Sequence, residues 1–314
     1  MRRVRGTRIA LAATFAVALV AVGAAQALRL PGAKRCPVFP ASNPWNARVD
    51  TLPVVADSDV MVASIGATAS VHADFGSGLW DGGPIGIPIT YATKTTPRSR
   101  VSFDYADESD RGPYPIPKTV AIEGGRGSEG DRHALIVDSS SCKLYELYAL
   151  YPKAGGSWKA GSGAIWSLTS NRLRPAGWTS ADAAGLPILP GLARWDEVAR
   201  GRIDHALRFT AARTRRAYVW PARHYASSVS DPRLPPMGLR VRLKASFDVS
   251  GFPRQSRVVL QALKTYGMIL ADIGSSWFIS GAPDRHWSND DLHSMGRVKG
   301  SDFEVVDTSS VAPH

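Results

Sequence analysis

Long apolar segments are scarce in this chain of 314 residues. The longest apolar run covers residues 9–22, which is shorter than the roughly 20 residues that a helix needs to span a bilayer. No later segment is apolar over such a length. The sequence therefore predicts no integral membrane span in the mature chain.

Familiar catalytic motifs are also missing. The chain contains no G-x-S-x-G nucleophile elbow, no H-E-x-x-H motif and no Walker A loop. Residues 125–130 match G-x-G-x-x-G, but a strand rather than a helix is expected after them, which excludes a dinucleotide site. Basic runs interleaved with aromatics are absent, so no nucleic-acid partner is expected. A dispersed Ser/His/Asp triad of a peptidase or esterase stays open, because such triads are recognised by geometry.

Cysteine is limited to Cys36 and Cys142. In an oxidising compartment two cysteines have one possible pairing, so we expect a disulfide that ties the N-terminal arm to the middle of the chain. Closing a loop of this length stabilises by about 4–5 kcal/mol in the chain-entropy model. Two buried thiols or a metal-binding pair are the alternatives, although cysteines so far apart make a poor metal signature.

What the chain does have begins with an export signal. Four arginines, the apolar run and the small-x-small site Ala25-Gln26-Ala27 predict a signal peptide over residues 1–27. We expect cleavage after Ala27 and a mature protein in the periplasm or the external medium. The formal net charge of +11 favours acidic partners such as uronate polysaccharides. A basic secreted protein without such a partner is the plainer interpretation.

The mature chain is dominated by short β patterns bounded by Gly, Pro, Ser and Asp. The expected strands cover residues 85–91, 101–105, 133–138, 143–150, 158–168, 203–210, 217–221, 239–244, 268–272, 277–280 and 303–307. Helices are expected over residues 57–65 and 253–266, and a capping box at 179–182 predicts one more helix start. This order predicts a mainly β fold, a jelly roll or β-sandwich with a few short helices and one longer C-terminal helix. We expect one monomeric domain over residues 28–314 with an extended N-terminal arm.

His133 and Glu146 are candidates for proton transfer. His133 opens one expected strand, and Glu146 lies in its hairpin partner. A carboxylate beside an imidazole can orient the ring or shift its pKa. A register shift of one residue would separate the two side chains. A catalytic pair and a structural cross-strand pair are both open interpretations.

Two further strands carry polar side chains in alternation with apolar ones. His205 shares a strand face with apolar residues, so it is either a core histidine or a proton-transfer group. Arg240, Arg242 and Lys244 form a cationic row on one face of the strand at 239–244. This row either lines a groove for an acidic sugar polymer or blunts an exposed sheet edge.

The loop at residues 220–225 is the preferred location for a ligand site. Trp220 and Tyr225 offer flat faces for stacking on a sugar, Arg223 a fork of donors, and His224 a titratable group. Most of the nine tryptophans and nine tyrosines in the chain are nevertheless expected in the core.

An acid-dense turn precedes Pro113. It contains four carboxylates, at Asp104, Asp107, Glu108 and Asp110. Calcium prefers several oxygen ligands from one loop, which makes Asp104, Asp107 and Asp110 a candidate calcium site. A solvated acidic turn explains the same residues, and the spacing is not that of a helix-loop-helix calcium motif. No other cofactor is predicted.

Several short segments carry a resemblance to a known group of proteins. They are N-P-W-N at 43–46, G-W-T-S-A-D at 177–182, D-H-A-L-R-F at 204–209, M-G-L-R at 237–240 and A-L-K-x-Y-G at 262–267. Through them the chain resembles a group of secreted bacterial proteins that lack an agreed activity. The resemblance implies an exported bacterial protein of jelly-roll type and no particular catalytic residue. A more distant similarity in layout connects it to jelly-roll glycoside hydrolases and polysaccharide lyases, which is an analogy of fold only.

These observations predict an exported protein that binds a polysaccharide and cleaves it as a hydrolase or a lyase. The candidates for proton transfer are His133, Glu146, His205 and His224. The candidates for substrate binding are Trp220, Arg223, Tyr225, Arg240, Arg242 and Lys244. A hydrolase requires two carboxyl groups beside the scissile bond. The alternative is a non-catalytic exported or envelope-associated module.

Overall fold

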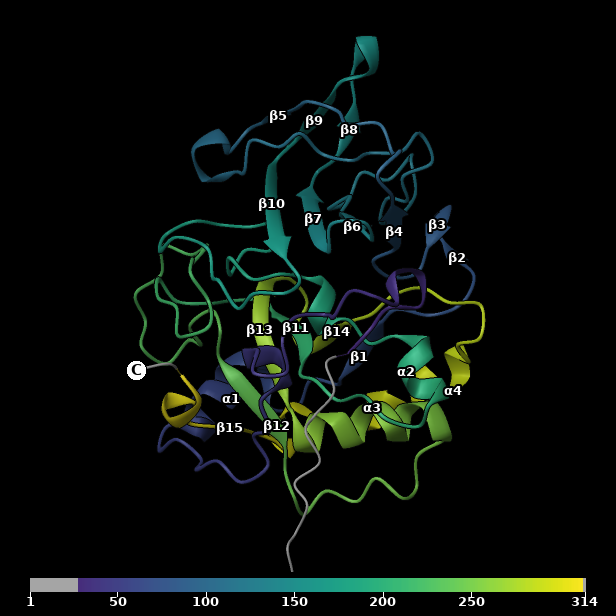
Figure 1. Cartoon of the computed structure of the whole chain (residues 1–314). Coiled ribbons are helices and arrows are strands. Elements are labelled where there is room, and N and C mark those ends of the chain that lie inside the picture. The colour runs from purple at the N-terminus through teal and green to yellow at the C-terminus, as the bar shows by residue number, and fades with distance from the viewer. Residues whose placement is uncertain (1–27, 313–314) are drawn as a thin grey trace, which may run out of the picture.

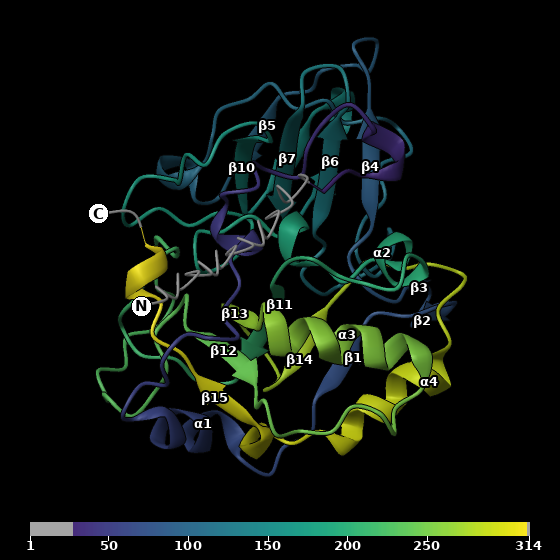
Figure 2. The ribbon, with the colours of Figure 1, turned by 60° about the horizontal axis from the view of Figure 1, so that its bottom comes forward.

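The computed structural model describes residues 28–312, so the expected signal peptide lies outside the described residues. The chain forms an upper and a lower lobe, each built around a sheet of parallel and antiparallel strands (Figure 1). Helices gather in the lower lobe, where Figure 2 shows α3 lying across the strands. None of the helices in the described part of the chain is both long and apolar enough to cross a membrane.

The lower lobe contains a six-stranded sheet in the order β1-β14-β11-β13-β12-β15. Its strands are β1 (His72–Asp74), β11 (Leu207–Ala211), β12 (Arg240–Leu243), β13 (Met268–Ile273), β14 (Phe278–Ser280) and β15 (Phe303–Val305). The helices are α1 (Ser58–Gly66), α2 (Trp195–Ala199), α3 (Arg254–Thr265) and α4 (Asn289–His293). Val259, Leu260 and Leu263 of α3 are buried in the same apolar cluster as the inner sheet residues. This amphipathic spacing explains why residues 254–265 form a helix that packs on the sheet.

The upper lobe contains a four-stranded sheet in the order β10-β7-β6-β4 and a three-stranded sheet in the order β5-β9-β8. The strands are β4 (Ile89–Ala92), β5 (Val101–Phe103), β6 (Ala134–Asp138), β7 (Lys143–Tyr148), β8 (Tyr151–Pro152), β9 (Trp158–Ala160) and β10 (Ser162–Ser167), and β2 (Leu79–Trp80) pairs with β3 (Gly83–Pro84). Every residue of β6 is buried, because the four-stranded sheet has an apolar cluster on each face.

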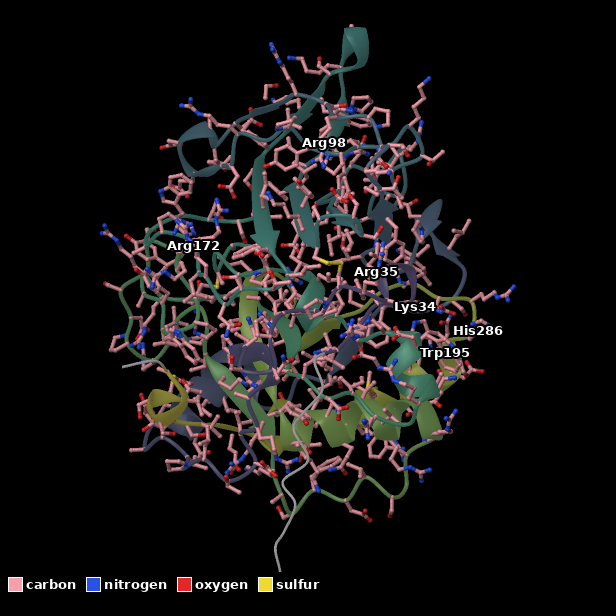
Figure 3. All side chains as sticks on the ribbon, viewed as in Figure 1. Lys34, Arg35, Arg98, Arg172, Trp195 and His286 are labelled. Atoms are coloured by element: carbon pink, nitrogen blue, oxygen red, sulfur yellow. A yellow bond between two sulfur atoms is a disulfide. The ribbon has the colours of Figure 1, made fainter. Side chains whose placement is uncertain are left out.

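The N-terminal arm connects both lobes. Leu30 and Phe39 belong to an apolar cluster of the upper lobe, whereas Trp45, 1% exposed, lies in the core of the lower lobe. The predicted disulfide between Cys36 and Cys142 is confirmed, and its sulfur atoms lie in the middle of the molecule in Figure 3. The arm is therefore held covalently to the turn after β6.

The prediction of a sheet-rich chain is confirmed, but neither a jelly roll nor a β-sandwich is. The expected longer C-terminal helix is wrong. Helix α3 has 12 residues and is not C-terminal, since β13, β14, α4 and β15 follow it. Its apolar face packs on the sheet of the lower lobe, so the helix belongs to the core of that lobe.

Two local predictions also differ from the structure. No helix follows the proposed capping box at residues 179–182, because the Asp182 carboxylate binds Arg208 instead of a helix N-terminus. The expected strand at 217–221 is reduced to one bridge between Tyr218 and Met237.

Candidate active site between the lobes

A row of polar side chains crosses four strands of the lower sheet. The register aligns Asp74 of β1 with Ser280 of β14, and Arg208 of β11 lies beside Ser280. A register shift between Phe209 and Thr210 then places Asp272 of β13, rather than Ala271, opposite Thr210. Such irregularities re-aim side chains next to functional sites. Four strands therefore present Asp74, Ser280, Arg208 and Asp272 on one face.

Arg208 is the centre of this row and is 4% exposed. Its guanidinium forms a bidentate pair with Asp182, with Nε to Oδ2 at 2.9 Å and Nη2 to Oδ1 at 2.8 Å. Nη2 also donates to Asp272 Oδ2 at 2.8 Å, and Nη1 donates to Ser280 Oγ at 2.6 Å. The buried charge is thus compensated by the Asp182 carboxylate, and Asp272 and Ser280 accept the remaining hydrogen bonds.

A cavity of about 480 Å³ lies between the lobes beside this cluster. Its lining combines two tyrosines, four carboxylates and one histidine: Tyr105, Tyr148, Glu108, Asp131, Asp182, Asp272 and His224. Tyr148 ends β7 in the upper lobe, whereas Asp272 belongs to β13 in the lower lobe. A cavity with aromatic walls and converging polar groups is the usual form of a small-ligand or oligomer site.

Asp272 has the electrostatic character of a proton donor. Its side chain is 18% exposed and lines the cavity. Burial, and after it the charge of Asp182, raise the pKa of Asp272 to about 7, although Arg208 and His133 act in the opposite direction. A carboxyl group with this pKa retains a proton near neutral pH.

Glu108 and His224 lie together at the cavity. Glu108 Oε2 accepts a hydrogen bond from the backbone N–H of Thr179 at 2.8 Å and is 3.9 Å from His224 Nε2. His224 Nδ1 donates to the carbonyl oxygen of Ala183 at 2.7 Å, because a carbonyl can only accept. The Tyr225 ring stacks on His224 at a centroid distance of 5.9 Å. Of the preferred loop at 220–225, His224 is the residue that lines this cavity.

His133 lies behind the cavity and is 2% exposed. Its Nδ1 is 2.6 Å from Glu123 Oε2, and its Nε2 is 3.0 Å from the carbonyl oxygen of Ala181. Burial alone would lower the pKa of His133, but the charge and hydrogen bond of Glu123 raise it to about 9. The sequence did not indicate Glu123 as this partner.

Glu146 is on the same hairpin but has other contacts. The register pairs Leu135 with Glu146, which places Glu146 and His133 on one face of the hairpin. The Glu146 carboxylate accepts from the backbone N–H groups of Ile188 and Leu189 and from the Trp166 indole. Burial raises the pKa of Glu146 to about 7 despite these donors. The two residues therefore share a face without a direct hydrogen bond.

The other sequence candidates lie elsewhere. His205 is buried in the lower lobe, where Nε2 is 3.1 Å from Glu197 Oε2 and Nδ1 donates to the carbonyl oxygen of Ala206. Arg223 donates to the carbonyl oxygen of Arg174, and the buried indole nitrogen of Trp220 has no protein partner among the described residues.

The cationic row on β12 is occupied by internal contacts. Arg240 donates to the carbonyl oxygens of Pro44, Ala47 and Tyr266. Arg242 bonds Glu304 at 2.8 Å and also the carbonyl oxygens of Val49 and Leu52, while Lys244 donates to the carbonyl oxygen of Ser301. None of the three lines the main cavity, since Arg240 and Arg242 hold the N-terminal arm and Lys244 contacts the loop before β15.

The acidic turn is divided between separate partners. Asp104 pairs with Lys159, Asp110 pairs with Arg174, and the exposed Asp107 belongs to a 3₁₀ turn. The described residues that gather metal-ligating atoms are instead Glu123, Asp131 and His133, whose ligand atoms lie within 4.8 Å of one another.

A second cavity of about 470 Å³ lies on the other side of this trio. Glu123 and Asp74 line it, with the exposed Trp80 at its rim and two histidines, His72 and His293. Glu123 thus faces the second cavity, whereas Asp131 faces the main one.

Outside the cavities, aromatic and charged side chains pair near the surface. The His286 ring stacks on Trp195 at a centroid distance of 5.5 Å, and Figure 3 shows the two beside each other at the edge of the lower lobe. Arg98, labelled in the upper lobe, pairs with Asp138 at 2.8 Å.

Sequence reasoning missed the centre of the site, which consists of Asp182, Arg208 and Asp272. One signal was present, since Arg208 lies between buried residues in a strand and a buried charge needs partners. Comparisons of the chain with protein-family models, with curated proteins and with solved structures found no match.

Proposed function

We propose that this protein is exported and that its main cavity binds and hydrolyses a polysaccharide, with Asp272 as the general acid. The observation that carries the proposal is the raised pKa of a carboxyl group that faces a cavity lined by other carboxylates. Glycoside hydrolysis requires one protonated and one ionised carboxyl group beside the scissile bond.

Glu108 is the second carboxyl group in this proposal. It lines the same cavity, where a hydrogen bond from the Thr179 backbone N–H orients its carboxyl group for the role of base. His224, at 3.9 Å, can hold or return a proton at this position. Tyr105, which is 55% exposed, and Tyr148 offer ring faces on which sugar rings can stack.

The charge of the cavity favours a neutral polymer over an acidic one. Four acidic side chains and no lysine or arginine line it, which disfavours binding of an anionic chain. A lyase would need a free cation to neutralise a uronate, but Arg208 is engaged by Asp182, Asp272 and Ser280. The disulfide supports export, because such bonds persist in oxidising compartments.

The test is release of reducing ends from a panel of neutral polysaccharides by the mature protein. Asp272→Asn should lower the rate by about 10²–10⁴-fold, the usual contribution of a general acid. Asp107→Asn is the matched control, since Asp107 is exposed and lies outside the cavity. Equal activity of wild type and Asp272→Asn would overturn the assignment.

A non-catalytic binding module is the alternative outcome. It predicts that the protein binds a polysaccharide in affinity electrophoresis while no new reducing ends form. Binding without cleavage would therefore retain the cavity as a ligand site and remove Asp272 from a catalytic role.

A further inference from the structure

The wall between the two cavities contains three side chains that can bind one metal ion. Glu123, Asp131 and His133 come from one stretch of chain that leads into β6, and their ligand atoms lie within 4.8 Å of one another. Ligand atoms around a zinc ion lie about 3–3.5 Å apart, because each is about 2.0–2.2 Å from the metal. Asp131 is exposed, so its side chain has room to move toward the other two.

The backbone fixes the orientation of the histidine in the way that metal sites require. Because a carbonyl oxygen can only accept, the contact of His133 Nε2 with Ala181 at 3.0 Å places a proton on Nε2. Nδ1 then points at Glu123, 2.6 Å from Oε2. Metal-ligating histidines commonly donate their other ring N–H to a carbonyl or carboxylate in this manner.

The surroundings supply charge and access for a cation. Asp74 and Glu123 line the second cavity together. The wall therefore carries an excess of carboxylates over His133, which a divalent cation would offset. Asp131 opens onto the main cavity, so an ion can enter from that side.

We propose that Glu123, Asp131 and His133 bind a divalent transition-metal ion, of which Zn²⁺ is the best match. One imidazole and two carboxylates suit Zn²⁺, whereas Ca²⁺ and Mg²⁺ prefer ligand sets made of oxygen alone. The proposed metal ligands are different residues from Asp272 and Glu108, so the site does not rest on the proposed hydrolysis. It extends the function of the protein to metal binding at the wall of its cavity.

The test is isothermal titration of tag-free, EDTA-dialysed mature protein with ZnCl₂, together with thermal unfolding. We expect one Zn²⁺ per chain and a higher Tm in its presence. Asp131→Asn should weaken binding by at least about tenfold without loss of the fold, because Asp131 is exposed. Asp107→Asn should bind Zn²⁺ as the wild type does.

Three results would overturn the site. They are absence of Zn²⁺ binding, undiminished binding by Asp131→Asn, and loss of binding in His293→Asn instead, which would move the ion to the second cavity. Because the readout is heat and Tm, failure of the metal site is distinguishable from failure of polysaccharide hydrolysis.

Discussion

At the scale of single residues, the proton on Asp272 governs the proposed chemistry. Its pKa is about 7, so the carboxyl group is protonated below that pH and ionised above it. A general acid must be protonated, hence the rate of hydrolysis should fall about tenfold per pH unit above pH 7. The measurement is kcat/KM from pH 5 to 9 in constant ionic strength. A rate that stays constant up to pH 9 would contradict the role of Asp272.

Arg208 makes a prediction about stability. Removal of its guanidinium in Arg208→Met leaves Asp182, 1% exposed, as a buried carboxylate without its ion-pair partner. Breaking a buried pair on one side costs about 3–5 kcal/mol of the free energy of unfolding. Urea unfolding by circular dichroism measures this loss.

The control for Arg208 is the removal of both partners. The double variant Arg208→Met/Asp182→Asn should recover part of the lost free energy, because no ionised group is then left unpaired in that contact. If the loss in the double variant equals the sum of the losses in Arg208→Met and Asp182→Asn, the two side chains are not energetically coupled.

At the scale of elements, Glu146 anchors the hairpin of β6 and β7 to the loop at Ile188. Both carboxylate oxygens accept N–H donors from Ile188, Leu189 and Trp166. In Glu146→Gln the amide NH₂ must face one of these donors, which should cost about 1–3 kcal/mol. Chemical denaturation at pH 8 checks the value. Glu146→Gln as stable as wild type at that pH would contradict the contacts.

The pH dependence of Glu146 has a definite sign. Its pKa is raised to about 7 in the folded state, so the native protein holds a proton between about pH 4.5 and 7 that the unfolded chain releases. The contribution of Glu146 to the free energy of unfolding is therefore largest below pH 4.5 and declines as the pH rises through 7. Glu146→Gln should flatten the stability profile in this window.

At the scale of the whole molecule, the disulfide links the arm to the upper lobe across 106 residues. Its removal in Cys36→Ser/Cys142→Ser should lower the free energy of unfolding by about 2–5 kcal/mol, mainly because the unfolded chain gains freedom. Urea titration with and without a reductant gives the same comparison for the wild type. Unchanged unfolding midpoints would show that the crosslink does not constrain the unfolded state.

The sequence was sufficient to predict features that depend on a local pattern of apolar residues or on the number of cysteines. The alternation of apolar residues predicted most strands, including those that form β6 and β7, although the single strand expected at 158–168 is divided into β9 and β10. The amphipathic spacing predicted a helix over residues 253–266, where α3 is found, and two cysteines left one disulfide. These features follow from short-range periodicity and from a count, so tertiary contacts were not needed to find them.

The cluster at the candidate site was decided by tertiary structure alone. Asp182, Arg208 and Asp272 are far apart in sequence, and alternation would group Asp272 with Met268 and Leu270 on one face of β13. The register shift beside Phe209 turns Asp272 toward Arg208, and the loop before Leu186 brings Asp182 to the same guanidinium. Such a cluster depends on sheet register and on the packing of two lobes. Both are set by long-range contacts, which produce no periodic pattern of residue types in the sequence.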